Sequence, residues 1–566
     1  MILMLRWPTA ILLILILANI GASALLVDSK GTGDFSKIQD AIDASEAGGE
    51  IIVLNGTYRE NLVVDRPITL RGDGKPVIAG GNSSAPLITI NASGVVLDGF
   101  VFSGCVDERY DSGAVLVLSD ESTIVNNTVS GSSGHGIHML NSKNHLISGN
   151  LIHDNSKAGI QFSGANYSRI AANDIRQNGY GIFIDRSEQN RISDSDVWDN
   201  RGDGIVISAT SMSEFINNSI HNNSENGIYH VDSDNNIITG NRIRDCKNCG
   251  INIDRSSYVM ILANTIERCG EMGVSLDTSN IAFVTLNTVS DNHLNGIAIL
   301  GSNYNTISRN LVRDNRDSGI SLRLGSERNI ITNNEISASR RYGLVFDGSN
   351  SNTAQENKIY NNTNGIVMLH SNGNSIVDNR IKENGYGLSL EIVDNVIISK
   401  NEIVNSSRDG IRLFQCYNSK IWANKIRDSR ADGVHITSSK GTIVSENDIE
   451  ESGGYGVQFL DHSNDNLLVS NLIKNSGLGG VYIFEGETNF VVNCALVDNS
   501  EFSGRDNCGM NCRNLWYSNY YSDFECEEAS WVEEVVCANP YVIQGHRGAT
   551  NFDTRPFSDR SIALGR

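Results

Sequence analysis

Asp254 and Asp277 occupy the same place in two consecutive copies of a strand-like motif, Gly-Ile-Asn-Ile-Asp and Gly-Val-Ser-Leu-Asp. If the copies stack as neighbouring strands, the two carboxylates lie about 5 Å apart. Like charges at that distance repel, so the pair shares a proton or a cation, or else lies on an exposed sheet where water solvates both acids. Calcium prefers such oxygen ligands. We therefore interpret the pair as two solvated surface acids, with a shared calcium site as the alternative.

The outward positions of neighbouring copies carry residues that suit sugar binding. The ring of Tyr229 could stack on a sugar face, and Arg323 could pair with the carboxylate of a uronate. A bound calcium ion would bridge the acidic protein to such a uronate. The predicted carbohydrate-binding residues are Tyr229, Asn252, Asp254, Asp277, Arg323 and Asp347. Asp254, Asp277 and Arg323 are also weak catalytic candidates, although no lyase motif surrounds them.

These residues are positioned by a repeat that runs through most of the chain. Its frame is Asn-x-Ile, a polar turn, Gly-Ile-x-Ile, a second polar turn and a short apolar strand. Sixteen steps separate Gly113 from Gly480, which gives a mean period of about 23 residues. The marker glycines are Gly113, Gly136, Gly159, Gly181, Gly204, Gly227, Gly250, Gly273, Gly296, Gly319, Gly343, Gly365, Gly387, Gly410, Gly433, Gly456 and Gly480.

A period of this length, built from strands and Gly/Asn/Ser/Asp turns, is typical of a solenoid. Side chains alternate within Gly-Ile-x-Ile, so that Ile251 and Ile253 point one way and Asn252 the other. A single coil cannot bury its apolar face alone, whereas stacked coils share one interior. The sequence therefore predicts an all-β fold, a single parallel β-helix, rather than several globular domains.

An asparagine recurs once per coil, with Ser195 as the one substitution. Asn carries both a donor and an acceptor, so a stacked column can satisfy itself and the turn backbone. We predict a structural role for this asparagine ladder, because a catalytic site would not need so many copies. Its members are Asn127, Asn150, Asn173, Asn218, Asn241, Asn264, Asn287, Asn310, Asn334, Asn357, Asn379, Asn401, Asn424, Asn447, Asn471 and Asn493.

The chain divides into four parts. Residues 1–24 are typical of a signal peptide, with an apolar run and an Ala-x-Ala cleavage site, and an uncleaved anchor is the alternative. Residues 25–102 form an N-terminal cap with the first coils, including a helix that starts after Asp34 or Ser36 as N-cap and plugs the open end. Residues 103–493 carry the repeats. Residues 494–566 form a Cys-rich C-terminal cap.

Composition narrows the class of function. The formal net charge is -21 at pH 7, and Lys and Arg are not clustered, so nucleic-acid binding is not expected. Beyond the signal peptide no stretch is apolar enough to cross a bilayer. We expect a secreted or cell-surface protein, periplasmic if its organism has a periplasm. The sequence repeat does not indicate an oligomeric state.

Ten cysteines in an exported chain are most simply interpreted as disulfides. Cys246 and Cys269 are one period apart, so their Cα atoms would lie within bridging range, and we predict a disulfide between them. The alternative is a thiolate metal site that also uses Cys249. A cluster that staples the C-terminal cap is predicted for Cys494, Cys508, Cys512, Cys526 and Cys537.

Several segments resemble a known family. Residues 31–42 with Gly56-Thr57-Tyr58-Arg59-Glu60-Asn61 resemble the entry segment of right-handed parallel β-helix proteins that act on or bind polysaccharides. The coils resemble the NosD-type family of carbohydrate-binding and sugar-hydrolysis (CASH) repeats, and residues 514–517, 540–543 and 553–557 are similar to its closing segment. The resemblance implies a right-handed helix, in keeping with the general crossover preference. Cys526 to Cys537 replace the Asp/Gly-rich stretch that the family has before Pro-Tyr.

Motif tests favour binding over catalysis. Gly134-His135-Gly136 resembles the Gly-His-Gly of polygalacturonase-like hydrolases, but the preceding coil has Gly-Ala-Val where carboxylates are needed, so we interpret His135 as a turn residue. Four Tyr-Gly pairs lack the Asp-x-His of uronan epimerases. The NosD resemblance implies copper, but we do not expect a copper site because His, Met and Cys do not cluster.

We therefore expect an exported protein that binds a polysaccharide or surface glycan. The alternatives are a polysaccharide lyase, uronan epimerase or glycoside hydrolase of the pectate-lyase-like superfamily, a structural or adhesive envelope protein, and a NosD-like copper-site maturation factor. Glycan binding, the function we expect, requires no cofactor.

Overall fold

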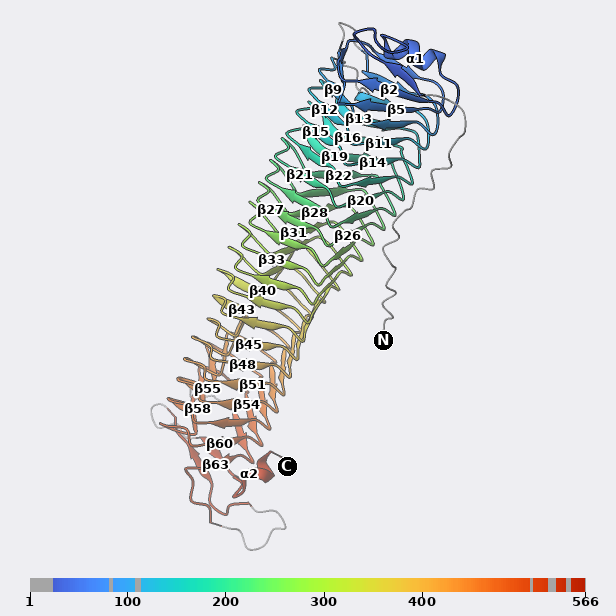
Figure 1. Cartoon of the computed structure of the whole chain (residues 1–566). Helices are drawn as coiled ribbons and strands as arrows, with labels where there is room; N and C mark the ends of the chain where they lie inside the picture. The colour runs from blue at the N-terminus through green and yellow to red at the C-terminus, as the bar shows by residue number, and fades with distance from the viewer. Residues whose placement is uncertain are drawn as a thin grey trace.

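The computed structural model describes residues 24–80, 85–106, 113–508, 513–527, 536–545 and 551–564. The predicted signal peptide lies outside these ranges except for Ala24. The chain winds into one long, gently curved rod with the helix α1 (Ile38–Ala44) at its N-terminal end (Figure 1). It is a right-handed parallel β-solenoid of about 21 turns with about 23 residues per turn, and 2% of it is helical. The predicted fold class is confirmed.

Each coil contributes one strand to each of three parallel sheets. Sheet A runs from β1 (Leu25–Val27) to β62 (Leu515–Tyr517). Sheet B runs from β3 (Thr57–Tyr58) to β63 (Tyr520–Tyr521), and sheet C from β4 (Leu62–Val64) to β61 (Gly504–Asn507). A middle coil consists of β26 (Ile237–Thr239), β27 (Arg242–Arg244) and β28 (Ile251–Asp254), and each pairs in parallel with its counterpart one coil on.

The turns explain why Asn precedes most strands of sheet B. After β26 and β27 the chain passes through a residue with positive φ, Gly240 (67°) and Asp245 (57°), and the following residue points inward. Gly, Asn and Asp tolerate this left-handed conformation best and recur at these turns, although other residue types such as Arg255 also adopt it. The alternation of the strands then directs side chains such as Ile243 and Ile253 into the interior, where both are fully buried.

The asparagine ladder is structural, as predicted. Asn264 Oδ1 accepts hydrogen bonds from the Asn241 backbone N (2.9 Å) and Nδ2 (3.0 Å), and its own Nδ2 donates to Ile238 O (2.9 Å). The predicted last member is wrong. Asn493 is a left-handed turn residue (φ 52°), and the ladder position after Asn471 is occupied by Cys494.

Three further buried columns of side chains follow the other turns. They were not predicted from the sequence because each column mixes several residue types. One begins at the end of sheet B, and two flank the turn between sheets C and A. Each member donates its backbone N–H to the side chain one coil on, as in Asn200 to Asn223 (3.1 Å) and Ser256 to Ser279 (3.1 Å). Representative members are Asn178, Asn200, Cys269 and Asn292 of the first column, Ser233, Ser256, Ser279 and Ser302 of the second, and Asn190, Ser213, Asn305 and Asn329 of the third.

The predicted disulfide between Cys246 and Cys269 is not formed, and both are free, buried thiols. They are successive members of the column that begins at the end of sheet B. Their thiols donate to turn carbonyls, Cys246 Sγ to Arg244 O (3.5 Å) and Cys269 Sγ to Glu267 O (3.7 Å), so they replace asparagine side chains. A hydrogen bond with Cys246, together with burial, raises the pKa of the Cys269 thiol well above its usual range. Burial also raises the pKa of Cys249 to about 12.

The N-terminal cap differs from prediction in how its helix starts. Neither Asp34 nor Ser36 caps α1; the N-cap is Lys37, which makes no side-chain capping bond. The Glu60 carboxylate, from the coil, accepts instead from the backbone N of Ile38 (3.0 Å) and of Gln39 (3.0 Å). Ile38, Ala41 and Ile42 are fully buried and belong to the continuous apolar core.

The C-terminal end is closed by buried carboxylates and aromatic rings. Asp553 on β65 (Asn551–Asp553) is fully buried and accepts from the backbone N of Ser518 (3.1 Å) and of Asn519 (2.9 Å). Tyr521 stacks on Tyr541 with ring centroids 3.7 Å apart. A Cys526–Cys537 disulfide is present, and Cys508 is also disulfide-bonded, whereas Cys512 lies outside the described residues. The predicted involvement of Cys494 is wrong, because it is a free thiol.

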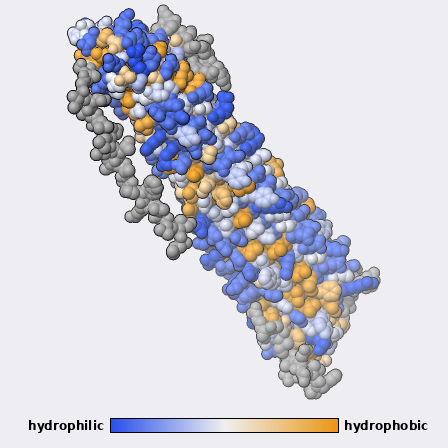
Figure 2. Space-filling view, turned by 90° about the vertical axis from the view of Figure 1, so that its right-hand side faces the viewer, coloured by the Kyte–Doolittle hydropathy of each residue, from blue (hydrophilic) through white to orange (hydrophobic). Residues whose placement is uncertain are grey.

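The face of the rod seen in Figure 2 is largely hydrophilic, with apolar side chains in separate patches along it. The first position of sheet A strands contributes several of the exposed apolar residues, namely Met260, Phe283, Ile330, Ile397, Ile443, Phe490 and Leu515.

Candidate functional site

The predicted site lies on the outward side of sheet C, and strand register confirms the columns. Tyr229 pairs with Asn252 in neighbouring strands, and Asp254 pairs with Asp277. The surface is not the flat exposed sheet that was predicted, because the central outward position is almost closed to solvent in several coils. These closed positions are Val206, Ser275, Ala298, Ser321 and Val345.

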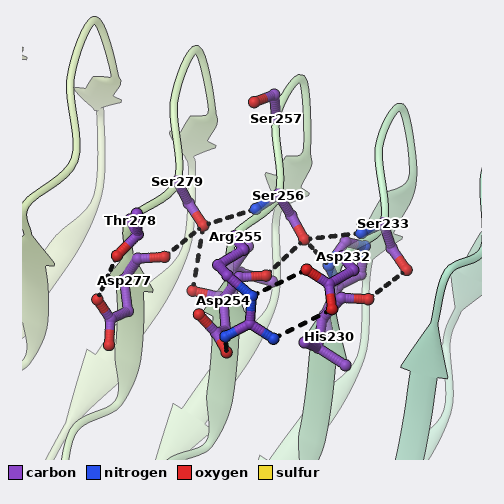
Figure 3. Close-up of polar contacts among 12 residues, drawn as sticks. His230, Asp232, Ser233, Asp254, Arg255, Ser256, Ser257, Asp277, Thr278 and Ser279 are labelled. Atoms are coloured by element: carbon purple, nitrogen blue, oxygen red, sulfur yellow. Dashed lines mark hydrogen bonds and ion pairs between the residues drawn. The ribbon is translucent and has the colours of Figure 1, made fainter.

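Arg255 already supplies a positive charge to Asp254 (Figure 3). Its Nη1 lies 2.5 Å from Asp254 Oδ2, while Nε and Nη2 contact the two oxygens of Asp232 at 2.9 and 3.1 Å. The hydrogen bond from Arg255 lowers the pKa of Asp232, and the same contacts raise the pKa of Arg255. Asp277 accepts instead from Thr278 Oγ1 (3.0 Å). Sharing of a calcium ion by Asp254 and Asp277 stays a prediction, with one of the two acids already neutralised.

The remaining predicted residues do not converge on this pair. Arg323 and Asp347 are neighbours in register, but Leu300 lies between Asp277 and Arg323. The Arg323 Nη2 is 3.7 Å from Asp317 Oδ2. The Tyr229 hydroxyl does approach Asp254 Oδ2, at 3.4 Å, and burial and the Asp254 charge raise the pKa of Tyr229. The structure thus brings Tyr229, Asn252 and Asp254 together and leaves Arg323 and Asp347 apart from them.

A cleft of about 790 Å³ opens on the same side of sheet C, nearer the N-terminus. It lies over β13 (His135–Leu140), β16 (Ala158–Ser163) and β19 (Tyr180–Asp185). The lining side chains that could contact a ligand are His135, His138, Lys157, Gln161, Ser163, Tyr180, Phe183, Asp185 and Arg186. Sequence reasoning did not recognise this cleft.

The floor of the cleft is polar and hydrogen-bonded. His138 and Gln161 are buried, and Ser163 Oγ lies 3.1 Å from both His138 Nε2 and Gln161 Nε2. His135 begins β13, which corrects its interpretation as a turn residue. Burial, with a smaller contribution from His138 and Lys157, lowers the pKa of His135 to about 3.

His135 is therefore neutral at physiological pH, and its protonation pattern follows from one contact. Its Nδ1 accepts a hydrogen bond from the backbone N of Ala158 (3.2 Å), so the ring proton is on Nε2. In this tautomer His135 is a donor toward the cleft and not a general base.

An aromatic pair forms one wall of the cleft. The rings of Tyr180 and Phe183 meet edge to face, with centroids 5.6 Å apart and an interplanar angle of 74°. Beside them Asp185 Oδ2 pairs with Arg186 Nε (2.8 Å). The strand register places Phe183 directly after Gln161 in the outward column of sheet C, so the wall adjoins the polar floor.

Comparisons with known proteins agree with the winding of the chain. A family described as "Right handed beta helix region" matches residues 112–259, 249–391 and 364–519. A cell surface glycoprotein of Methanothermus fervidus is 31% identical over 128 residues, which is 22% of this chain and 22% of that protein. The chain thus spans about a fifth of the length of this curated relative.

Among solved structures, the A-module of mannuronan C-5 epimerase from Azotobacter vinelandii has 18% identity and a TM-score of 0.38, covering 59% of this chain and 91% of its own. The DFA-IIIase of Arthrobacter chlorophenolicus A6 has 12% identity and a TM-score of 0.41, covering 55% and 94%. In the described part of the chain no helix has the length and apolar character that a membrane span needs.

Proposed function

The chain belongs to the right-handed β-helix family, and on that premise we propose that it is an exported cell-surface protein that binds a polysaccharide in the cleft of sheet C without cleaving it. The observation that carries this proposal is the edge-to-face pair of Tyr180 and Phe183 beside a floor of His138 and Gln161. Sugars present apolar ring faces and many hydroxyl groups, and this cleft offers a partner for each.

The size and charge of the cleft support the proposal. Its volume of about 790 Å³ falls in the range of small-ligand sites, roughly 300–1,000 Å³. Lys157 and Arg186 line it in a protein whose net charge is -21, so this is a place where an acidic sugar would meet positive charge. We expect uronate-containing or otherwise acidic chains to bind better than neutral ones.

We propose binding without cleavage because the cleft lacks the catalytic groups that hydrolysis needs. Glycoside hydrolysis usually needs two carboxyl groups on either side of the bond. Of the described residues that line the cleft, Asp185 is the one carboxylate, and it is paired with Arg186. His135 does not replace the missing base, because its free ring nitrogen carries the proton.

The cell-surface location is part of the same proposal. The partial relative from Methanothermus fervidus is named a cell surface glycoprotein, and the Cys526–Cys537 disulfide is of a kind that persists outside the cytosol. Fractionation of the native host followed by immunodetection of the protein tests the location.

The binding test is a glycan array on the mature protein, followed by affinities for the best acidic ligand. We expect the Tyr180→Ala, Phe183→Ala double variant to lower affinity by about 5- to 10-fold or more, because an aromatic contact contributes about 1–1.5 kcal/mol. The matched control is the Asp254→Asn, Asp277→Asn double variant on the same face, which should bind normally. Loss of binding in that control alone would place the site at the first predicted acids.

Two other results would contradict the proposal. Absence of binding to any glycan would remove the function. New reducing ends or unsaturated uronates after incubation with a bound polysaccharide would show that the protein is an enzyme.

A further inference from the structure

A cluster of two buried aspartates and a histidine lies on the C-terminal half of sheet C, distant in sequence from the cleft. Asp409, Asp432 and His435 each offer one ligand atom, and these atoms all lie within 4.8 Å of one another. Asp409 precedes β49 (Ile411–Phe414), Asp432 precedes β52 (Val434–Thr437), and His435 projects from the outward side of β52. Sequence reasoning did not single out these three residues.

We propose that Asp409, Asp432 and His435 bind a divalent first-row transition-metal ion such as Zn²⁺. Zinc takes both carboxylate oxygen and imidazole nitrogen, and three protein ligands leave a fourth position for water or an acidic ligand. Calcium and magnesium prefer oxygen alone, so the histidine argues against them. This site is independent of the proposed carbohydrate cleft.

Hydrogen bonds from the backbone orient the two carboxylates, as is usual for metal ligands. Asp409 Oδ1 accepts from the backbone N of Asp432 (3.0 Å), and Asp432 Oδ1 accepts from the backbone N of Tyr455 (2.7 Å). Each aspartate therefore has one oxygen fixed by the backbone and a second oxygen available to a ligand. On Asp432 this second oxygen, Oδ2, faces His435 Nδ1 at 2.8 Å.

The imidazole is held in the same manner. His435 Nε2 lies 2.7 Å from Thr437 Oγ1, two residues along the same strand. An outer hydrogen bond of this kind fixes the ring orientation and leaves the other nitrogen for the metal. Ligands of tetrahedral zinc lie about 3.3 Å apart, so small side-chain shifts would close this set around an ion.

A second observation points independently to a cation. Asp409 and Asp432 are stacked in adjacent coils, and both are only 7% exposed. Among the described residues no Lys or Arg forms an ion pair with either acid; the nearby Arg412 lies over the rings of Tyr386 and Phe414 instead. Two buried carboxylates side by side are costly unless a proton or a cation offsets their repulsion, and a divalent ion fills that requirement. The side chain of His435 is 19% exposed, which leaves a route for entry from solvent.

The chain offers a matched control at Asp203. This residue occupies the same turn position, before a marker glycine, and it is also buried. Its Oδ1 accepts from the backbone N of the next coil, Asn226 (2.8 Å), just as Asp409 does from Asp432. The outward position of its following strand is Val206 instead of a histidine, so the Asp203→Asn variant should bind metal as the wild type does.

The experiment is calorimetric titration of the untagged full chain with Zn²⁺ alone, and with Ca²⁺ for comparison. We expect one zinc ion per chain and much weaker binding of calcium. Asp409→Asn and His435→Gln should each abolish zinc binding or weaken it by at least about 100-fold, and Thr437→Val by about 10- to 100-fold. Circular dichroism checks that each variant is folded. His435 is more exposed than Asp409, so His435→Gln keeps the test decisive if Asp409→Asn does not fold.

Cobalt replaces zinc to identify the ligands. A Co²⁺ spectrum without a thiolate charge-transfer band supports oxygen and nitrogen ligands. A spectrum with that band would assign the metal to the buried cysteines and overturn the proposal. Absence of zinc binding at millimolar concentration, or unchanged binding in His435→Gln, would also overturn it.

Discussion

Replacing Asn264 by alanine should destabilise the centre of the rod by about 2–4 kcal/mol. Asn264 is 1% exposed, and its side chain joins three coils. Its Oδ1 is the acceptor for the backbone N of Asn241 (2.9 Å), and its Nδ2 donates to Ile238 O (2.9 Å) and Asn287 Oδ1 (3.0 Å).

The magnitude follows from which groups lose their partners. After truncation the buried N–H of Asn241 has no acceptor, which costs about 1–3 kcal/mol, and the lost bond to Ile238 O and the small cavity add to this. Asn287 Oδ1 keeps its bond from the Asn264 backbone N (2.8 Å), so the damage stays local. Asn264→Ser should cost less, because at the natural substitution Ser195 the hydroxyl still accepts from the backbone N of Asn173, one coil earlier (3.2 Å).

The assay must detect local opening, since a solenoid need not unfold in one step. Hydrogen exchange of the amides in residues 228–297, together with urea unfolding, measures the loss. The control is Asn222→Gly, at an exposed turn residue with φ 56°, where glycine adopts the same conformation and we expect a change below about 0.5 kcal/mol. Equal losses in Asn264→Ala and Asn222→Gly would refute the structural role of the ladder.

Three further predictions concern buried groups. Burial raises the pKa of Asp203 to about 6, so the folded state binds the carboxyl proton more tightly than the unfolded state does. The free energy of unfolding therefore falls as pH rises from about 4 to 6. In the Asp203→Asn variant this fall should be absent when the thermal midpoint is measured against pH. Burial lowers the pKa of His230 to about 3, so the neutral ring stabilises the fold above about pH 6.5 and this stabilisation is lost as pH falls toward 3. His230→Gln should reduce the fall of the thermal midpoint over this acidic range. Glu60→Ala should destabilise the N-terminal cap by about 1–2 kcal/mol, because α1 loses its capping carboxylate, and faster limited proteolysis before residue 60 measures it.

The regular part of the fold could be predicted because one backbone conformation is repeated in every coil. The marker glycines and ladder asparagines recur at nearly every turn, so the period, the parallel pairing and the inward strand faces follow from the sequence. The other three columns were missed because Asn, Ser, Thr and Cys all satisfy the same buried turn. That equivalence also explains the error at Cys246 and Cys269, whose spacing indicates stacking but not oxidation.

Candidate sites were harder to predict. The repeat period shows which side chains lie in the same column, but it does not show which of them form hydrogen bonds or ion pairs. Asp254 and Asp277 are in register as expected, yet Arg255, a turn residue outside the outward column, reaches back to Asp254. A repeated backbone offers the same outward positions in every coil, so chemistry arises only where neighbouring coils differ from the repeat in a coordinated way. By that criterion the aromatic wall at residues 180–183 and the acid–histidine group at residues 409–435 are better candidates than an isolated pair of like charges.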